Sequence, residues 1–295
     1  MTGPILVFGA EGQTGRELIV LASRRKVAVV GLSRAEADIT RAEAVRAAIE
    51  RHRPVLVVNV AGYTAVDRAE SEPELAHAAN VEGPAVIAAA SARANVPLVH
   101  LSTDYVFDGK KSGAYVEDDP IAPLSVYGRT KAEGETQVRK LQPHHVVLRT
   151  SWVYGVHGTN FLKTVLRLAS ERNELRIVAD QFGCPTATAD IAEAILVLAP
   201  RLAADASVSG TYHFAATGST SWHGFATEIV ARQRSFTGRD PRVVAIAAAD
   251  YPAAARRPPN SVLDCRRFAA TFGYSAHPWQ ERVAETVDRL LRAAR

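Results

Sequence analysis

The sequence predicts an α/β protein with a Rossmann-type doubly wound parallel sheet and a smaller mixed α/β domain for the substrate. Short apolar runs alternate with helical patterns, a glycine-rich turn follows the first run, and polar or small residues follow most later runs. Continuous apolar runs are typical of strands that are buried on both faces of a parallel sheet. Ligands bind such sheets beyond the carboxyl ends of the strands. The polar and small residues that follow the apolar runs therefore predict a ligand-binding site at that edge of the sheet.

The elements follow one another in a regular order. Apolar runs predict strands at residues 5–8, 27–31, 55–59, 97–101, 145–149 and 211–215. Helical patterns cover residues 41–51, 72–94, 160–172, 187–198, 222–233 and 280–294. Two more helices are expected: one follows the glycine turn directly, and the other carries Tyr127. We assign residues 1–155 and 187–216 to the dinucleotide-binding domain, and residues 156–186 and 217–295 to the substrate domain.

Composition excludes several classes of protein. The chain has 295 residues, 22% of them charged, and a formal net charge of +4. Arginines alternate with acidic residues along the last helix, which indicates a solvated face and not a nucleic-acid surface. No apolar run approaches the ~18 residues of a membrane span, and no signal peptide pattern opens the chain. Cys184 and Cys265 cannot form a disulfide framework, so we expect a cytoplasmic protein.

The glycine turn lies between a strand and a helix, which is the context of a dinucleotide site. Gly9, Gly12 and Gly15 are spaced Gly-x2-Gly-x2-Gly, with Gln13 and Thr14 between the last two. Glycines allow a tight turn and a close approach of the backbone to a pyrophosphate at the helix N-terminus. A glycine-rich turn without a ligand is the alternative interpretation.

Tyr127 and Lys131 are four positions apart, so their side chains share one helix face. A phenol has a reference pKa near ~10, and a neighbouring ammonium lowers the pKa, so Tyr127 could exchange a proton with a sugar oxygen. This spacing alone is weak, because an exposed helix pair has the same pattern. Ala61 and Gly62 after the third strand, and Thr103 after the fourth, place more candidate residues at the same edge of the sheet.

Seven stretches together resemble the extended short-chain dehydrogenase/reductase superfamily, and more narrowly the dTDP-4-dehydrorhamnose reductases. They cover residues 9–15, 63–70, 102–108, 127–131, 149–154, 180–186 and 251–261, in the order of that family. The most specific are Ser-Thr-Asp-Tyr-Val-Phe at 102–107 and Arg-Thr-Ser-Trp-Val-Tyr at 149–154. The glycine turn and the Tyr-x3-Lys pair are shared across the superfamily.

The resemblance implies roles for individual residues. Tyr127 would protonate the C4 oxygen of a sugar ketone as hydride arrives, Lys131 would bind the nicotinamide ribose and tune Tyr127, and Thr103 would hydrogen-bond the reacting oxygen. The residues expected to contact the substrate are Thr103, Asp104, Trp152, Asn160 and Arg257. The residues expected to contact the cofactor are Gly9, Gly12, Gln13, Thr14, Gly15, Ser33, Arg34, Asp38, Ile39, Ala61, Gly62, Tyr63, Leu101, Tyr127 and Lys131.

Two expectations concern the cofactor and a metal. Ser33 and Arg34 follow the second strand, where NAD-specific sites carry an acid, so we expect NADPH in preference to NADH, which remains possible. Magnesium at a dimer interface is described for some relatives. Glu17 matches one of its ligands, but residues 186–190 lack the glutamate that other members carry there, so Mg²⁺ is doubtful and no metal ligand is assigned.

The resemblance implies NADPH-dependent reduction of dTDP-4-dehydro-L-rhamnose to dTDP-L-rhamnose, for rhamnose-containing polysaccharides or glycosides. Three alternatives stay open. The chain could be a 4-ketoreductase for another dTDP-deoxysugar, an epimerase or dehydratase on the same fold, or a non-catalytic regulatory subunit of the methionine adenosyltransferase beta type. The intact Thr103, Tyr127 and Lys131 disfavour the last. We expect a dTDP-sugar as the partner, no nucleic acid or membrane, and a monomer or homodimer.

Overall fold

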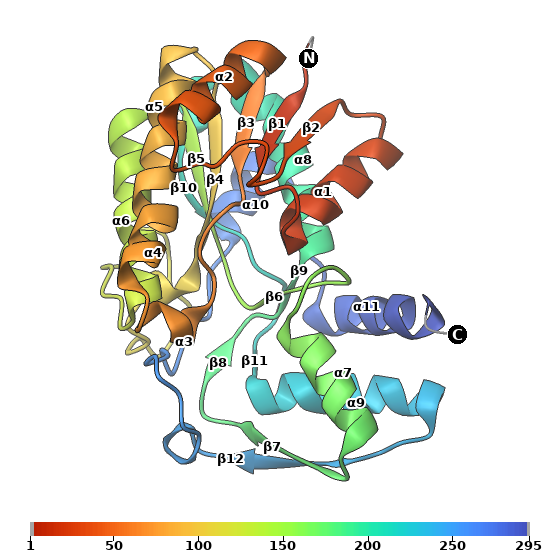
Figure 1. Ribbon diagram of the computed structural model, residues 1–295. Coiled ribbons are helices and arrows are strands. Elements are labelled where there is room, and N and C mark those ends of the chain that lie inside the picture. Colours follow the sequence, from red (N-terminus) through yellow and green to blue (C-terminus); the bar gives the residue numbers. More distant parts are fainter. Residues whose placement is uncertain (1–2, 294–295) are drawn as a thin grey trace.

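A six-stranded parallel sheet forms the centre of the computed structural model, which describes residues 3–293 (Figure 1). The strand order is β10-β5-β4-β3-β1-β2, and every neighbouring pair is parallel. The strands are β1 (Ile5–Phe8), β2 (Val29–Leu32), β3 (Leu56–Asn59), β4 (Leu98–Thr103), β5 (His145–Thr150) and β10 (Gly210–His213). β2 and β3 lie on opposite sides of β1, so the chain reverses direction across the sheet there. The predicted doubly wound fold is confirmed.

Alternate residues of β1 face opposite layers of the protein. Ile5 and Val7 pack in one apolar core with helices α1 (Gln13–Arg24), α8 (Thr188–Ala204) and α10 (Arg266–Phe272). Leu6 and Phe8 pack in the other core with helices α2 (Ala42–His52), α5 (Gly83–Arg93) and α6 (Val126–Leu141). All four side chains of β1 are fully buried, because helices cover both faces of the sheet.

The helix predicted at residues 72–94 is interrupted. It consists of α4 (Pro73–His77), a π-helical turn (Ala78–Glu82) and α5. The buried Asn80 lies in that turn, and a Cβ atom at Gly134 of α6 would come within 2.0 Å of its carbonyl oxygen. Helix α6 therefore approaches this segment more closely than a larger residue would allow. A further short helix, α3 (Val66–Ala69), precedes α4.

Most of the remaining elements gather around a separate apolar core, below the sheet in Figure 1. Its helices are α7 (Phe161–Glu171), α9 (Trp222–Thr237) and α11 (Trp279–Ala293). Its paired strands are β7 (Glu174–Val178) with β12 (Arg242–Ile246), β8 (Phe182–Gly183) with β11 (Thr220–Ser221), and β6 (Val153–Tyr154) with β9 (Thr186–Ala187).

The C-terminal segment contains elements that the pattern did not predict. Strand β12 was missed, and so was α10, which packs against β10 and α8 on the large sheet. The last helix was expected to reach residue 294, which lies outside the described residues. No helix within residues 3–293 is long and apolar enough to cross a membrane.

Candidate active site

The glycine turn between β1 and α1 leaves room for a backbone-bound ligand. Gly9 has a φ of +86°, and a Cβ atom there would lie 2.6 Å from the Ala61 nitrogen. A Cβ atom at Gly15 would lie 2.4 Å from the Gly9 oxygen, so both positions require glycine. Gly12 caps α1 without a side-chain hydrogen bond, and the first turn carries no acid. The free N–H groups at this end suit a pyrophosphate, so these residues fit a dinucleotide.

The loop after β3 closes the turn from the other side. The Asn59 side chain accepts the N–H of Ala61 at 3.0 Å. Asn80 accepts the N–H of Tyr63 at 2.8 Å and donates to its carbonyl oxygen at 3.0 Å. Sequence reasoning did not assign Asn80 to the site. A buried asparagine inside a helical pattern was the available signal, because such a side chain must find polar partners.

Thr103 and Asp104 lie side by side at the carboxyl end of β4. The Thr103 hydroxyl donates to Asp104 Oδ1 at 3.0 Å, and the Ser151 hydroxyl donates to Asp104 Oδ2 at 3.0 Å. Burial raises the pKa of Asp104 to about 6, against the opposing effect of hydrogen bonds from Ser261, Ser151 and Thr103. Asp104 is therefore a buried carboxylate that titrates close to neutral pH.

Helix α6 brings Tyr127 and Lys131 to the same edge. Two side chains hold the first turn of this helix by hydrogen bonds to its backbone. The Ser125 hydroxyl accepts the N–H of Gly128 at 3.1 Å, and the Glu70 carboxylate accepts the N–H of Val126 at 2.8 Å. The Lys131 ammonium donates to the carbonyl oxygen of Leu101 on β4 at 2.7 Å. The structure thus brings Leu101 and Lys131 together, as expected for residues of one site.

Burial dominates the electrostatics of Tyr127 and Lys131. Burial raises the pKa of Tyr127 to about 12, while the Thr103 side chain acts in the opposite direction. Lys131 does not contribute to that shift. Burial also lowers the pKa of Lys131 to about 8, partly offset by the Glu135 carboxylate. The tuning of Tyr127 by Lys131 therefore stays a prediction; in this structure the Lys131 ammonium is bonded to Leu101, and burial sets the direction of the Tyr127 shift.

An acid from three positions further along the chain reaches Ser33 at the end of β2. Glu36 folds back and accepts hydrogen bonds from the N–H and the hydroxyl of Ser33, at 2.8 and 2.7 Å. Arg34 pairs with Asp38 at 3.1 Å. Ile39 is 7% exposed and packs in the core beside α5, so it supports the site from beneath.

Three candidate substrate residues remain, and each is held by a partner from another element. Trp152 has a φ of +45° and stacks on Trp222 with ring centroids 3.5 Å apart, so it is largely buried. Asn160 caps α7 and donates to the Gln13 side chain at 2.8 Å, which ties the lower core to the glycine turn. Arg257 forms a two-point ion pair with the Asp67 carboxylate, and its closer contact is 2.7 Å.

Glu17 does not have the surroundings of a magnesium ligand. It is buried on α1, and Arg289 of α11 lies 3.2 Å from its Oε1 atom. The Nε2 atom of His157 lies 3.6 Å from the other carboxylate oxygen, Oε2. A guanidinium at this place supplies positive charge where a cation would bind, so the residues do not fit Mg²⁺. In the described part of the chain, no three metal-ligating side chains gather.

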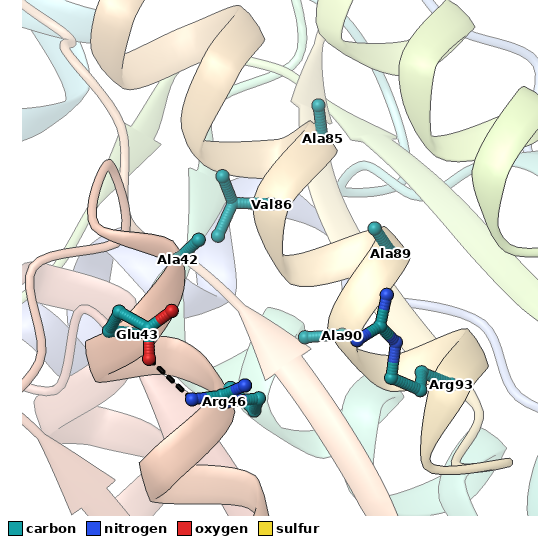
Figure 2. Close-up of a pocket in the computed structure, with 8 residues that line it drawn as sticks. All are labelled: Ala42, Glu43, Arg46, Ala85, Val86, Ala89, Ala90 and Arg93. Carbon is teal, nitrogen blue, oxygen red and sulfur yellow. Dashed lines mark hydrogen bonds and ion pairs between the residues drawn. The ribbon is translucent and has the colours of Figure 1, made fainter.

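A surface groove elsewhere does not belong to this site. It lies between α2 and α5 and is lined mainly by alanines, with an ion pair of Glu43 and Arg46 on one side (Figure 2). None of the candidate residues lines this groove. The site is therefore defined by the convergence of strand ends and not by this groove.

The fold, the glycine turn and the Tyr127–Lys131 pair define the class of short-chain dehydrogenases and reductases. The family model described as RmlD substrate binding domain matches residues 1–292. A dTDP-4-dehydrorhamnose reductase of Burkholderia thailandensis is 45% identical over 97% of this chain and 99% of that protein. The chain belongs to the dTDP-4-dehydrorhamnose reductase family.

Solved structures agree with this assignment. The crystal structure of a dTDP-4-dehydrorhamnose reductase from Clostridium acetobutylicum has a TM-score of 0.90 at 37% identity and covers 97% of this chain and 99% of that one. The enzyme of the same name from Bacillus anthracis, in complex with NADP, has a TM-score of 0.89 at 34% identity. It covers 98% of this chain and 100% of that one. These likenesses extend over both the sheet and the lower core.

Proposed function

We propose that this protein reduces the C4 ketone of dTDP-4-dehydro-L-rhamnose with NADPH, giving dTDP-L-rhamnose, and that Tyr127 donates the proton. The observation that carries the proposal is the convergence of Tyr127, Thr103 and Lys131 at the end of β4, beside a turn that fits a dinucleotide. Relatives with the matching name support the choice of substrate.

When bound, the reduced nicotinamide supplies the hydride. Tyr127 is a neutral phenol at physiological pH, since its pKa is about 12, and it therefore holds a proton to donate to the C4 oxygen. The Thr103 hydroxyl, which donates to Asp104 in the structure, would turn its proton toward that oxygen and orient it. Lys131 is held by Leu101 and positions the ribose side of the cofactor. The proton leaves Tyr127 only in the transition state, where the oxygen gains charge.

The sugar nucleotide would lie between the sheet and the lower core. In this proposal, residues 1–155 and 187–216 form the domain that binds the cofactor, and residues 156–186 and 217–295 form the domain that binds the substrate. Helix α10 belongs to the second range by sequence but packs on the large sheet. Asp104 would accept a sugar hydroxyl. Arg257 would bind the diphosphate, because a guanidinium binds phosphate oxygens at two points. Asn160 and Trp152 would shape the pocket through Gln13 and Trp222.

The direct test supplies dTDP-4-keto-L-rhamnose and NADPH, follows the loss of nicotinamide absorbance, and identifies the product by NMR. Formation of dTDP-L-rhamnose is the expected result. A different 4-hydroxy sugar from another dTDP-ketosugar, with no turnover of this one, would favour the alternative 4-ketoreductase. No turnover of any ketosugar would favour a binding role such as the regulatory subunit. We further propose a cytoplasmic protein that acts as a monomer or homodimer.

A further inference from the structure

A single hydrogen bond joins the side chains of Thr103 and Asp104 at the carboxyl end of β4. The Thr103 hydroxyl oxygen lies 3.0 Å from Asp104 Oδ1, and it also accepts the backbone N–H of Tyr105 at 3.2 Å. A hydroxyl has one proton to donate and two lone pairs that accept. The Tyr105 N–H occupies one lone pair of Thr103, so the charge of Asp104 decides how the other lone pair and the proton are used.

The second oxygen of Asp104 is held as an acceptor. Asp104 Oδ2 accepts the Ser151 hydroxyl at 3.0 Å, and the Ser151 oxygen in turn accepts the backbone N–H of Cys184 at 3.3 Å. Asp104 and Ser151 are 2% and 0% exposed, so these bonds are shielded from bulk water. When this carboxyl group takes up a proton, the proton therefore belongs on Oδ1, between Asp104 and Thr103.

The two charge states of Asp104 give Thr103 opposite roles. When the carboxylate is ionised, Thr103 donates its one proton to Oδ1 and can only accept hydrogen bonds from other groups. When Asp104 is protonated, Oδ1 donates to Thr103, both lone pairs of Thr103 are occupied, and the Thr103 proton is released. Tyr127 lies within hydrogen-bonding reach of the Thr103 side chain, so an oxygen held by Tyr127 is close to that proton.

The charged and titratable groups around Asp104 come from four segments of the chain: Tyr105, Tyr127, Lys131, Cys184 and Arg257. Burial raises the pKa of both tyrosines and of the thiol, so these three groups stay neutral at physiological pH. The Arg257 guanidinium, which pairs with Asp67, stays charged. Burial lowers the pKa of Lys131 to about 8 and raises that of Asp104 to about 6. Among these groups, Asp104 changes charge at the lowest pH.

We infer that Asp104 acts as a buried carboxylic acid that turns the Thr103 hydroxyl toward the reacting oxygen. Asp104 is a positioning residue in this inference, because it acts through Thr103. The inference rests on the proposed function, since the reacting oxygen is the C4 ketone oxygen of that reaction. Protonated Asp104 frees Thr103 to donate beside Tyr127, and ionised Asp104 withdraws that donor. Loss of one preorganised donor to a developing oxyanion lowers kcat by about 10²–10³, so the ionised form is nearly inactive.

The test measures kcat against pH at saturating NADPH and ketosugar, in the wild type and in Asp104→Asn. The amide keeps the shape of the acid and offers Thr103 a donor that is independent of pH. Wild-type kcat should fall about tenfold per pH unit from about pH 6 to about pH 7.5, below the pKa of Lys131. Over the same range, kcat of Asp104→Asn should stay constant. The KM of the sugar reports separately on the proposed contact between Asp104 and a sugar hydroxyl.

Asp118→Asn is the matched control, because the Asp118 carboxylate is 77% exposed and pairs with Arg267. This variant should keep the wild-type pH profile. Ser151→Ala should move the profile instead of removing it. Burial raises the pKa of Asp104, and the Ser151 hydroxyl opposes that effect. Without the hydroxyl, the fall in kcat should shift to higher pH by about one unit, which a role of Asp104 in folding alone would not produce.

Three results would overturn the inference and leave the proposed function standing. The first is a wild-type kcat that stays constant from about pH 6 to about pH 7.5. The second is the same fall in kcat in Asp104→Asn as in the wild type. The third is loss of turnover in Asp104→Asn at every pH, with NADPH still bound in a fluorescence titration. Failure of the wild type to reduce the ketosugar at any pH would instead overturn the proposed function itself.

Discussion

Arg149 forms a buried two-point ion pair with Glu135. Its Nε atom lies 2.9 Å from Oε1, and its Nη2 atom lies 2.8 Å from Oε2. Ser102 of β4 donates to the same carboxylate at 2.6 Å. Arg149 belongs to β5, and Glu135 follows Lys131 by one turn of α6. The pair therefore ties the helix that carries Tyr127 to the two strands beneath it.

Arg149→Met should lower the free energy of unfolding by about 3–5 kcal/mol, because it leaves the Glu135 carboxylate buried without its main partner. Urea denaturation at neutral pH measures the change. Arg139→Met is the matched control: Arg139 also contacts Glu135, at 3.1 Å, but its side chain is 35% exposed. The control should cost about 1 kcal/mol or less. Equal losses in the two variants would contradict the anchoring role of Arg149.

Tyr127→Phe should lower kcat by about 10²–10⁴, the usual contribution of general acid catalysis. The dissociation constant of the cofactor should change little, since the glycine turn and Lys131 remain. Steady-state kinetics with the ketosugar and fluorescence titration with NADPH measure the two quantities. Turnover close to that of the wild type would show that Tyr127 is not the proton donor.

Lys131 should make stability depend on pH in a defined window. Its pKa is about 8 in the folded protein and near ~10.4 in the unfolded chain. Between these values the unfolded chain binds the extra proton, so the free energy of unfolding rises with pH. Relative to Lys131→Met, the wild type should gain about 1–2 kcal/mol between pH 7.5 and 9.5, measured by urea denaturation. A difference that stays constant over this range would argue against a lowered pKa.

Chelation should leave the wild type unchanged, since Arg289 supplies the positive charge beside Glu17. Melting temperature and turnover should be equal in EDTA and in Mg²⁺. Arg289→Glu should lose about 1–3 kcal/mol in EDTA through repulsion between two carboxylates, and Mg²⁺ should recover part of that loss.

Arg292→Glu is the control for this charge reversal, because Arg292 lies on the same helix but pairs loosely with Asp288, at 3.8 Å. Its stability should not respond to Mg²⁺. Loss of turnover by the wild type in EDTA would show that a metal ion, and not Arg289, supplies the positive charge beside Glu17.

The sequence by itself determined the features that depend on local backbone geometry. The turn of Gly9, Gly12 and Gly15, the alternation of strands and helices, and the shared helix face of Tyr127 and Lys131 all follow from spacing along a few residues. Such patterns survive folding because a helix or a strand has a fixed repeat. The sequence pattern did not predict the π-helical turn at Ala78–Glu82 or strand β12. Each depends on the element against which it packs, α6 for the turn and β7 for the strand.

Only the tertiary structure decided which charged side chains meet. Arg289 reaches Glu17 across 272 positions, and Arg257 reaches Asp67 across 190. Burial by distant elements, and not the neighbouring sequence, raises the pKa of Tyr127 and lowers that of Lys131. Even Glu36 and Ser33, three positions apart, pair in a turn that begins beside the glycine turn, where Leu32 accepts the N–H groups of Gly9 and Ala10. Ion pairs and desolvation depend on distances through space, which the packing of the whole chain fixes and no local spacing encodes.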